Sequence, residues 1–297
     1  MKILLAIDGS PHAQETIRFL TGFPFQSPPE IIVVHACFVP NLHDLGSVVT
    51  ADVNRLVDEF RTEGENLLKL SATKCETWAQ HVSTRLLSGI PAKEILKCAR
   101  QEHVDLIVIG SRGLGSVNRF LLGSVSEKVT LYAPCSVLVV RSPHSADALI
   151  SRTILFADDA SDEISLAIET FAQLPLGPER RVSLLGLLEF THNKVLQEFI
   201  ENNPFWKAQA AELEGHLLSS QRQLAATKAA IQSQLLKSEH TANAILKAAE
   251  EQGADLIVLG STGKNTWERL LLGSVSTRVL RHAHCSVWIQ RIPSRDR

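Results

Sequence analysis

The chain has 297 residues and a formal net charge of −2, and 44% of its residues are apolar against 21% that are charged. This composition is typical of a globular protein of two domains and excludes a mainly disordered chain. Residues 1–150 carry 14 basic and 15 acidic side chains and residues 151–297 carry 16 and 17, so each half is at −1. Because neither half holds a basic block, we expect no nucleic-acid partner.

The apolar runs of the sequence have the length of strands. Runs such as 3–7 and 106–109 fall far short of the ~20 residues that a membrane helix needs, so we expect no membrane partner. Asp8 interrupts the first run, and we therefore expect no export signal. The cysteines number five and form no Cys-x-x-Cys pair, as is typical of reduced cysteines. Together these features predict a cytoplasmic protein.

Two stretches of the chain repeat one another. Residues 104–129 and 254–279 align at a shift of 150 without a gap and are identical at more than half of their positions. The simplest explanation is the tandem duplication of one domain. The sequence predicts a first domain at 1–143, a second domain at 150–297, and a polar, proline-containing linker at 141–147.

Within each copy, short apolar runs alternate with longer helical patterns. In the first copy we predict strands at 2–7, 30–37, 81–88, 105–110 and 136–141, and helices at 11–21, 52–76, 91–102 and 124–132. In the second copy we predict strands at 152–157, 181–187, 229–236, 255–260 and 286–291. This alternation, with nearly continuous apolar strands, predicts an α/β fold with a parallel sheet covered on both faces. The helical region at 193–226 is longer than its counterpart, and we interpret it as a cover helix rather than a contact surface.

The end of the first strand is the first candidate site. In a doubly wound sheet of order 3-2-1-4-5, ligands bind between the carboxyl ends of strands 1 and 4. Strand 1 leads into Asp8, and Ser10 is the predicted N-cap of a helix that begins at Pro11. The Asp8 carboxylate either accepts a hydrogen bond from a ribose hydroxyl or holds Mg²⁺. The alternative is that it only helps to cap that helix. In the second copy Asp159 aligns with Asp8, and Asp158 adds a second carboxylate.

The loop after the fourth strand keeps one glycine spacing in both copies. It has Gly110-x-x-Gly113, nine residues and then Gly123-Ser124, and the second copy repeats this spacing at Gly260, Gly263, Gly273 and Ser274. Glycines let a ligand approach the backbone N–H groups closely, and a loop of this length is usually functional. The S-x-x-E form that begins at Ser124 predicts a capping box at a helix start, where phosphate binds well. The motifs GxxxxGK[ST] and GxGxxG are absent, which disfavours P-loop NTPases and dinucleotide-dependent dehydrogenases.

The spacing G-x2-G-x9-G-[ST] resembles the ATP-binding signature of the universal stress protein family. The opening strand with Asp8 and the closing run Cys135-Ser136-Val137-Leu138-Val139-Val140 are also similar to that family, and the resemblance covers both halves. It implies two Rossmann-like domains of the adenine nucleotide alpha hydrolase-like type, each with a five-stranded parallel sheet of order 3-2-1-4-5. It also implies that the last strands of the two copies pair in an intramolecular pseudo-dimer, and it leaves a homodimer of whole chains open.

The resemblance further implies where an adenine nucleotide binds. Asp8 would lie at the ribose and phosphates, and the backbone near Ala36 would meet the adenine edge. The ribose and triphosphate would be lined by Ile109, Gly110, Arg112, Gly113, Gly123, Ser124, Val125 and Ser126. The matching positions of the second copy are Asp159, Leu187, Leu259, Gly260, Gly263, Gly273, Ser274, Val275 and Ser276. The expected cofactor is ATP, together with Mg²⁺, and ADP or AMP is the alternative.

The function that follows is a stress-response or signalling protein whose conformation or choice of partner depends on bound nucleotide. Two alternatives stay open. One is a slow ATPase or phosphotransferase in which Asp8 or Asp158 places metal and water, and the other is a nucleotide-free interaction scaffold. The sequence indicates no catalytic nucleophile and no set of side chains with the spacing of a metal site. We expect nucleotide in the first copy and leave the second copy open.

Overall fold

The computed structural model describes residues 1–37, 51–113, 122–141, 152–189, 203–263 and 272–292. The chain divides into two compact units. The first is made chiefly of Met1–Gly22 and Ser27–Ser142, and the second is made of Phe23–Gln26 and Pro143–Ile292. Within the described residues, no helix is both long enough and apolar enough to span a bilayer.

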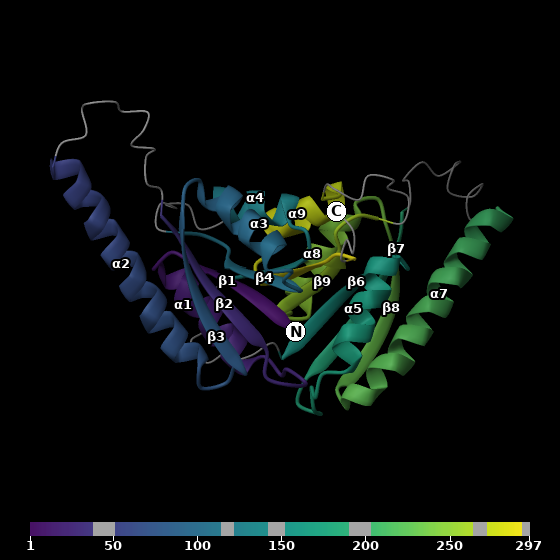
Figure 1. Cartoon of the computed structure of the whole chain (residues 1–297). Helices are drawn as coiled ribbons and strands as arrows, with labels where there is room; N and C mark the ends of the chain where they lie inside the picture. The colour runs from purple at the N-terminus through teal and green to yellow at the C-terminus, as the bar shows by residue number, and fades with distance from the viewer. Residues whose placement is uncertain (38–50, 114–121, 142–151, 190–202, 264–271, 293–297) are drawn as a thin grey trace. The chain divides into compact units, whose positions relative to one another are not determined.

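The first unit is built on a five-stranded parallel sheet, part of which is labelled in Figure 1. Its strands are β1 (Lys2–Ile7), β2 (Glu30–Cys37), β3 (His81–Ser88), β4 (Leu106–Gly110) and β5 (Ser136–Val140). They pair in the order β3-β2-β1-β4-β5, with Ile3 opposite both Ile31 and Leu106. The chain runs outward in opposite directions from β1 and β4, so ligands are expected beyond the carboxyl ends of these two strands.

Helices cover both faces of this sheet (Figure 1). One pair consists of α1 (Pro11–Gly22) and α2 (Ala51–Cys75), and the other consists of α3 (Pro91–Gln101) and α4 (Ser124–Tyr132). Every residue of β4 and β5 is buried, and so is all of β1 after its first residue. Burial on both faces explains why these strands are apolar throughout rather than alternating.

The second unit repeats the same design. Its strands are β6 (Thr153–Asp158), β7 (Arg181–Glu189), β8 (Ala230–Ser238), β9 (Leu256–Gly260) and β10 (Ser286–Gln290). They pair in the order β8-β7-β6-β9-β10. The helices are α5 (Asp162–Ala172), α7 (Pro204–Leu224), α8 (Thr241–Glu251) and α9 (Ser274–His282), with a short 3₁₀ turn η2 (Ala225–Thr227). Ile154 lies opposite Leu256, as Ile3 lies opposite Leu106, so the two sheets share their register.

The predicted fold class is therefore confirmed, and the predicted strands agree with the observed ones to within two residues. The long helical region of the second copy contains α7, which buries Leu213, Leu217 and Leu224 and packs on β7 and β8 as a cover helix. Residues 193–202 of that prediction lie outside the described residues. Arg141, the first residue of the predicted linker, is buried directly after β5. The other residues of the predicted linker, 142–147, lie outside the described part of the chain.

Candidate functional site

The first unit brings the loop after β1 and the loop after β4 into contact. A Cβ atom built on Gly113 would overlap the Oδ2 atom of Asp8. Asp8 follows β1 and Gly113 follows β4, so two residues that are far apart in the sequence meet at one edge of the sheet. A side chain at position 113 would have to displace this carboxylate oxygen, so glycine keeps the close approach open. The structure thus brings together the two loops that the sequence singled out.

Asp8 shapes the turn that leads into α1. Its Oδ1 atom accepts a hydrogen bond of 3.0 Å from the backbone N–H of Ser10. Ser10 in turn caps α1, because its Oγ atom accepts from the N–H of Ala13 at 3.2 Å, as predicted. Gly9 lies between them with a φ of 80°, a left-handed conformation that favours glycine. The capping interpretation of Asp8 therefore accounts for one carboxylate oxygen, while the other lies beside Gly113.

The loop after β4 is closed by backbone hydrogen bonds around Ser111. The N–H of Ser111 donates to the carbonyl of Val140 at 2.8 Å, and the carbonyl of Ser111 accepts from the N–H of Gly123 at 2.8 Å. The Ser111 side chain is buried, yet its Oγ atom has no hydrogen-bond partner among the described residues. A buried hydroxyl without a partner is costly, and it indicates a place where a ligand or water supplies the missing bond.

The helix α4 begins at Ser124, as predicted, but without a capping box. Its N-cap is Gly123, in extended conformation with φ −67° and ψ 146°, and no side chain caps the helix. The prediction that Ser124 caps the helix is therefore wrong, since this residue already lies inside the first turn. The N–H groups of Ser124, Val125 and Ser126 consequently find no acceptor in the described part of the chain. Unpaired N–H groups at the positive end of a helix are a ready site for phosphate.

Ser126 anchors this helix start to the end of β4. Its hydroxyl is buried and donates to the carbonyl of Gly110 at 2.6 Å. The same bond recurs in the second unit, where the hydroxyl of Ser276 donates to the carbonyl of Gly260 at 2.7 Å. The hydroxyl proton of each serine is thus used within the protein, and the backbone N–H is the donor that these residues offer to a ligand.

The first turn of α1 adds His12, a residue that sequence reasoning did not select. A Cβ atom on Gly110 would lie 3.3 Å from the Cβ atom of His12, so the imidazole-bearing residue packs against the end of β4. Burial lowers the pKa of His12, the charge of Arg112 lowers this pKa further, and the charge of Asp8 opposes the shift. His12, Arg112 and Asp8 therefore share one site, and His12 is neutral at pH 7.

The two predicted strand residues of this site lie at or near the carboxyl ends of their strands. Ala36 is half-buried near the end of β2, opposite Leu87 of β3. Ile109 is buried in β4 between Ala6 and Val139, so its side chain belongs to the core and only its backbone faces the loop edge.

The second unit builds the turn after β6 with alanine in place of glycine. Ala160 has a φ of 56°, the left-handed conformation that Gly9 adopts in the first unit. The N–H of Ser161 donates to Oδ1 of Asp159 at 3.1 Å, which repeats the bond made by Asp8. A Cβ atom on Gly263 would lie 3.8 Å from Oδ2 of Asp159, so these two predicted residues also meet. The left-handed conformation costs a non-glycine residue about 1 kcal/mol.

Asp158 does not face the loops, contrary to the prediction that it adds charge near the phosphates or places a metal. Its side chain is fully buried and points toward α7. There Oδ1 lies 3.2 Å from Nε2 of His216, and Oδ2 accepts from the hydroxyl of Ser220 at 3.3 Å. Desolvation by burial raises the pKa of Asp158, so its surroundings do not favour the charged form. The reason is strand geometry, since successive side chains of β6 point to opposite faces of the sheet.

A carboxylate from α5 occupies the loop after β9. Oε1 of Glu163 accepts from the hydroxyl of Ser261 at 2.6 Å, and Oε2 accepts from the N–H of Thr262 at 2.9 Å and lies 3.5 Å from its hydroxyl. Glu163 takes the place that His12 has in the first unit, because the shift of 151 residues that aligns Asp8 with Asp159 also aligns His12 with Glu163. Sequence reasoning missed Glu163, although the alignment of the two copies contained the signal.

The other predicted residues of the second unit keep the places of their counterparts. Leu187 lies near the end of β7 and Leu259 is buried in β9. The start of α9 has Gly273 as its N-cap, as the start of α4 has Gly123. The remaining predicted residues, Gly260, Ser274, Val275 and Ser276, form the end of β9 and the first turn of α9.

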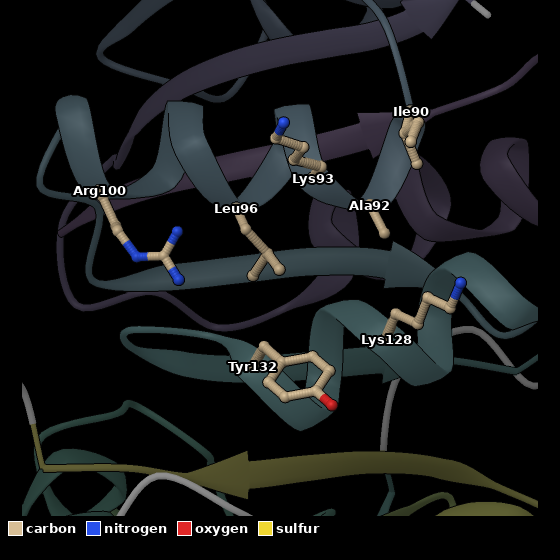
Figure 2. A pocket seen from close by; sticks show the side chains of 7 residues that line it. All are labelled: Ile90, Ala92, Lys93, Leu96, Arg100, Lys128 and Tyr132. Carbon is tan, nitrogen blue, oxygen red and sulfur yellow. The ribbon is translucent and has the colours of Figure 1, made fainter.

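A separate hollow of about 400 Å³ lies between α3 and α4 of the first unit (Figure 2). No residue predicted for the nucleotide site lines it. Its lining residues are Ile90, Ala92, Lys93, Leu96, Arg100, Lys128 and Tyr132. The side chains of Ile90 and Tyr132 are exposed, and three cations surround an apolar floor. The helix α4 thus has its first turn at the loop after β4 and its last residue at this hollow.

The fold and the paired loops define two doubly wound α/β domains whose ligand edge lies between the first and fourth strands of each unit. The profile of the universal stress protein family matches residues 1–141 and, a second time, residues 151–291. The chain therefore belongs to the universal stress protein family, a family of stress-response proteins, and contains two copies of its domain.

Individual relatives agree with this assignment. A universal stress protein of Methanocaldococcus jannaschii is 33% identical over 143 residues, which are 48% of this chain and 82% of the relative. A universal stress protein of Thermus aquaticus is 37% identical over 140 residues, which are 47% of this chain and 97% of the relative. Among solved structures, a universal stress protein from Archaeoglobus fulgidus superimposes with a TM-score of 0.69 at 22% identity. The superposition covers 99% of this chain and 97% of that one, so the whole fold is shared.

Proposed function

We propose that the first unit binds an adenine nucleotide, ATP with Mg²⁺ in the first place, between the loops after β1 and β4. The observation that supports this most is the set of unused donors in the loop after β4. The hydroxyl of Ser111 and the N–H groups of Ser124, Val125 and Ser126 have no partner among the described residues. Donors of this kind, gathered at a helix start, fit the oxygens of a phosphate chain.

The charges of the site also fit a nucleotide. Arg112 supplies a positive charge for the phosphates, and His12 is neutral. Asp8 has one carboxylate oxygen engaged by Ser10 and the other beside Gly113, in the position that the family resemblance assigns to the ribose and phosphates. Mg²⁺ would be held mainly by phosphate oxygens, as is usual for this ion, with Asp8 as the available carboxylate.

We further propose that bound nucleotide acts on the rest of the protein through α4. The first turn of this helix offers its N–H groups to phosphate, and Lys128 and Tyr132 further along it line the hollow shared with α3 (Figure 2). Nucleotide should therefore slow hydrogen exchange not only in the loop but along α4 to Tyr132. Protection confined to the loop after β4 would contradict this route.

Isothermal titration of the full chain with MgATP, ADP and AMP tests the site itself. In Gly113→Val the new Cβ atom would overlap Oδ2 of Asp8, so we expect the affinity for ATP to fall roughly 100-fold or more. Gly215→Ala is the matched control, because Gly215 lies exposed on α7 with no atom within 4 Å of an added Cβ. Unchanged affinity in Gly113→Val, or no binding by the wild type, would contradict the proposal.

Two further measurements separate the alternatives. Mass spectrometry of the ligand released from the purified protein identifies the nucleotide directly, and the absence of any adenine ligand together with no binding would favour a scaffold. Phosphate release from ATP that is lost in Asp8→Ala would favour a slow ATPase, since Asp8 is the one predicted metal-placing carboxylate that lies at the loops.

A further inference from the structure

We propose that Glu163 is an internal anion of the second unit, which occupies the serine hydroxyl after β9 whose counterpart after β4 is open to phosphate, so that the chain binds one nucleotide and not two. This inference rests on the proposed function of the first unit. It adds the statement that only the first of the two sites is open to a nucleotide. It begins from a comparison of equivalent atoms in the two copies of the domain.

One loop donor, the serine hydroxyl that follows the fourth strand, is empty in the first unit and occupied in the second. Ser111 and Ser261 hold equivalent places, since the N–H of each donates to the last strand of its unit and the carbonyl of each accepts from the glycine before the next helix. The hydroxyl of Ser111 has no partner among the described residues, whereas that of Ser261 donates to Glu163 at 2.6 Å. The N–H of Thr262 adds a second bond to the same carboxylate at 2.9 Å.

Glu163 does not make these bonds as part of capping its own helix. The cap of α5 is Ser161, whose Oγ atom accepts from the N–H of Ile164 at 3.4 Å. The carboxylate of Glu163 instead crosses to a loop 98 residues further along the chain. Its position in the first turn of α5 favours a negative charge, because the helix dipole is positive at that end. A charge that is held by two well-formed bonds and a helix terminus is not readily displaced.

The charge of the second site is also wrong for phosphate. In the first unit Asp8 and Arg112 sum to zero (−1 and +1), with His12 neutral. In the second unit the equivalent residues are Asp159, Thr262 and Glu163, which sum to −2 (−1, 0 and −1). A triphosphate that approached this loop would meet two carboxylates and no compensating side chain among these positions, so repulsion and occupied donors act in the same direction.

The test is the number of MgATP molecules that one full-length chain binds in isothermal titration. We expect one for the wild type, and we expect two for the double variant Glu163→His, Thr262→Arg, which gives the second loop the residues of the first. The mirror variant His12→Glu places a carboxylate beside the first loop, and we expect its affinity to fall roughly 100-fold or more. Asp162→Asn is the control, since Asp162 is an exposed neighbour of Glu163 in the same helical turn.

The outcomes separate this inference from the function on which it rests. Two nucleotides per wild-type chain would overturn the inference and leave the proposed function intact, whereas no binding by the wild type would overturn the proposed function itself. A double variant that still binds one nucleotide would also overturn the inference, provided that its unfolding curve matches that of the wild type. Combining the double variant with Gly113→Val assigns the new site, because only a nucleotide in the second unit would then remain.

Discussion

The contact between Asp158 and His216 in the second unit allows a quantitative test, because the first unit contains its apolar counterpart. The alignment that matches Asp159 with Asp8 also matches Asp158 with Ile7. Counted back eight residues from the ends of the cover helices, at Cys75 and Leu224, His216 matches Leu67. One copy of the domain therefore builds with two apolar side chains what the other builds with a carboxylate and an imidazole. Replacing Asp158 and His216 by Ile and Leu should restore the apolar pair.

The expected energies follow from burial. The side chain of Asp158 has no exposed surface, and that of His216 is 23% exposed. Leaving a buried polar group without one of its partners costs about 1–3 kcal/mol. For His216→Leu we expect a loss of about 2 kcal/mol, since the histidine is partly exposed and two hydrogen bonds to Asp158 remain. The double variant should be at least as stable as the wild type and up to about 3 kcal/mol more stable.

The same pair gives a pH dependence whose sign follows from the pKa of Asp158. Burial raises this pKa in the folded state, while the N–H of Ala160 and the charge of His216 oppose the shift. A folded state with the higher pKa binds the proton more tightly than the unfolded chain, whose value is about 3.9. The free energy of unfolding should therefore fall as pH rises from about 4 through the raised pKa, and the double variant should lack this slope.

Urea unfolding of the full chain, followed by circular dichroism at about pH 5 and about pH 8, measures both effects. The two units need not unfold together, so the transition that responds to His216→Leu identifies the second unit. A coupling energy between the two substitutions near zero would refute the reasoning, and so would a double variant less stable than His216→Leu alone.

Two other predictions concern the turns and the nucleotide site. Ala160→Gly should raise the free energy of unfolding of the second unit by up to about 1 kcal/mol, because φ is 56° there and Gly9 fills the same position in the first unit; a lower melting temperature in calorimetry would contradict this. Burial and the charge of Arg112 lower the pKa of His12 in the free protein, and bound phosphate should raise this pKa again because it favours the protonated imidazole. The affinity for MgATP should therefore rise as pH falls below 7, by up to about tenfold for each unit by which binding raises the pKa of His12. In His12→Gln the pH dependence of the affinity should shrink to that of ATP itself. An identical pH dependence in the wild type and in His12→Gln would exclude His12 as its source.

Several features of this protein follow from local sequence alone. The strands could be predicted because residues buried on both faces must be apolar in an unbroken run, and that pattern needs no partner to be recognised. The meeting of Asp8 with Gly113 could also be predicted, since a parallel sheet of this order always places the ends of its first and fourth strands side by side. The repeat then extended both conclusions to the second copy.

Other features depended on the tertiary structure. Whether Ser124 caps α4 depends on where the chain enters the helix, and Gly123 proved to be the cap because the loop closes one residue earlier through Ser111. The direction of Asp158 depends on which face of β6 it occupies and on what α7 presents there. The alignment of the two copies shows that Glu163 replaces His12, but the bond from Ser261 to Glu163 joins two segments that no periodicity relates, so only the folded chain shows what Glu163 binds. Sequence thus determined which elements form and at which edge of the sheet a ligand is expected. Packing across the sheet decided which side chains remain free at that edge, because hydrogen bonds between distant segments exist only in the assembled fold.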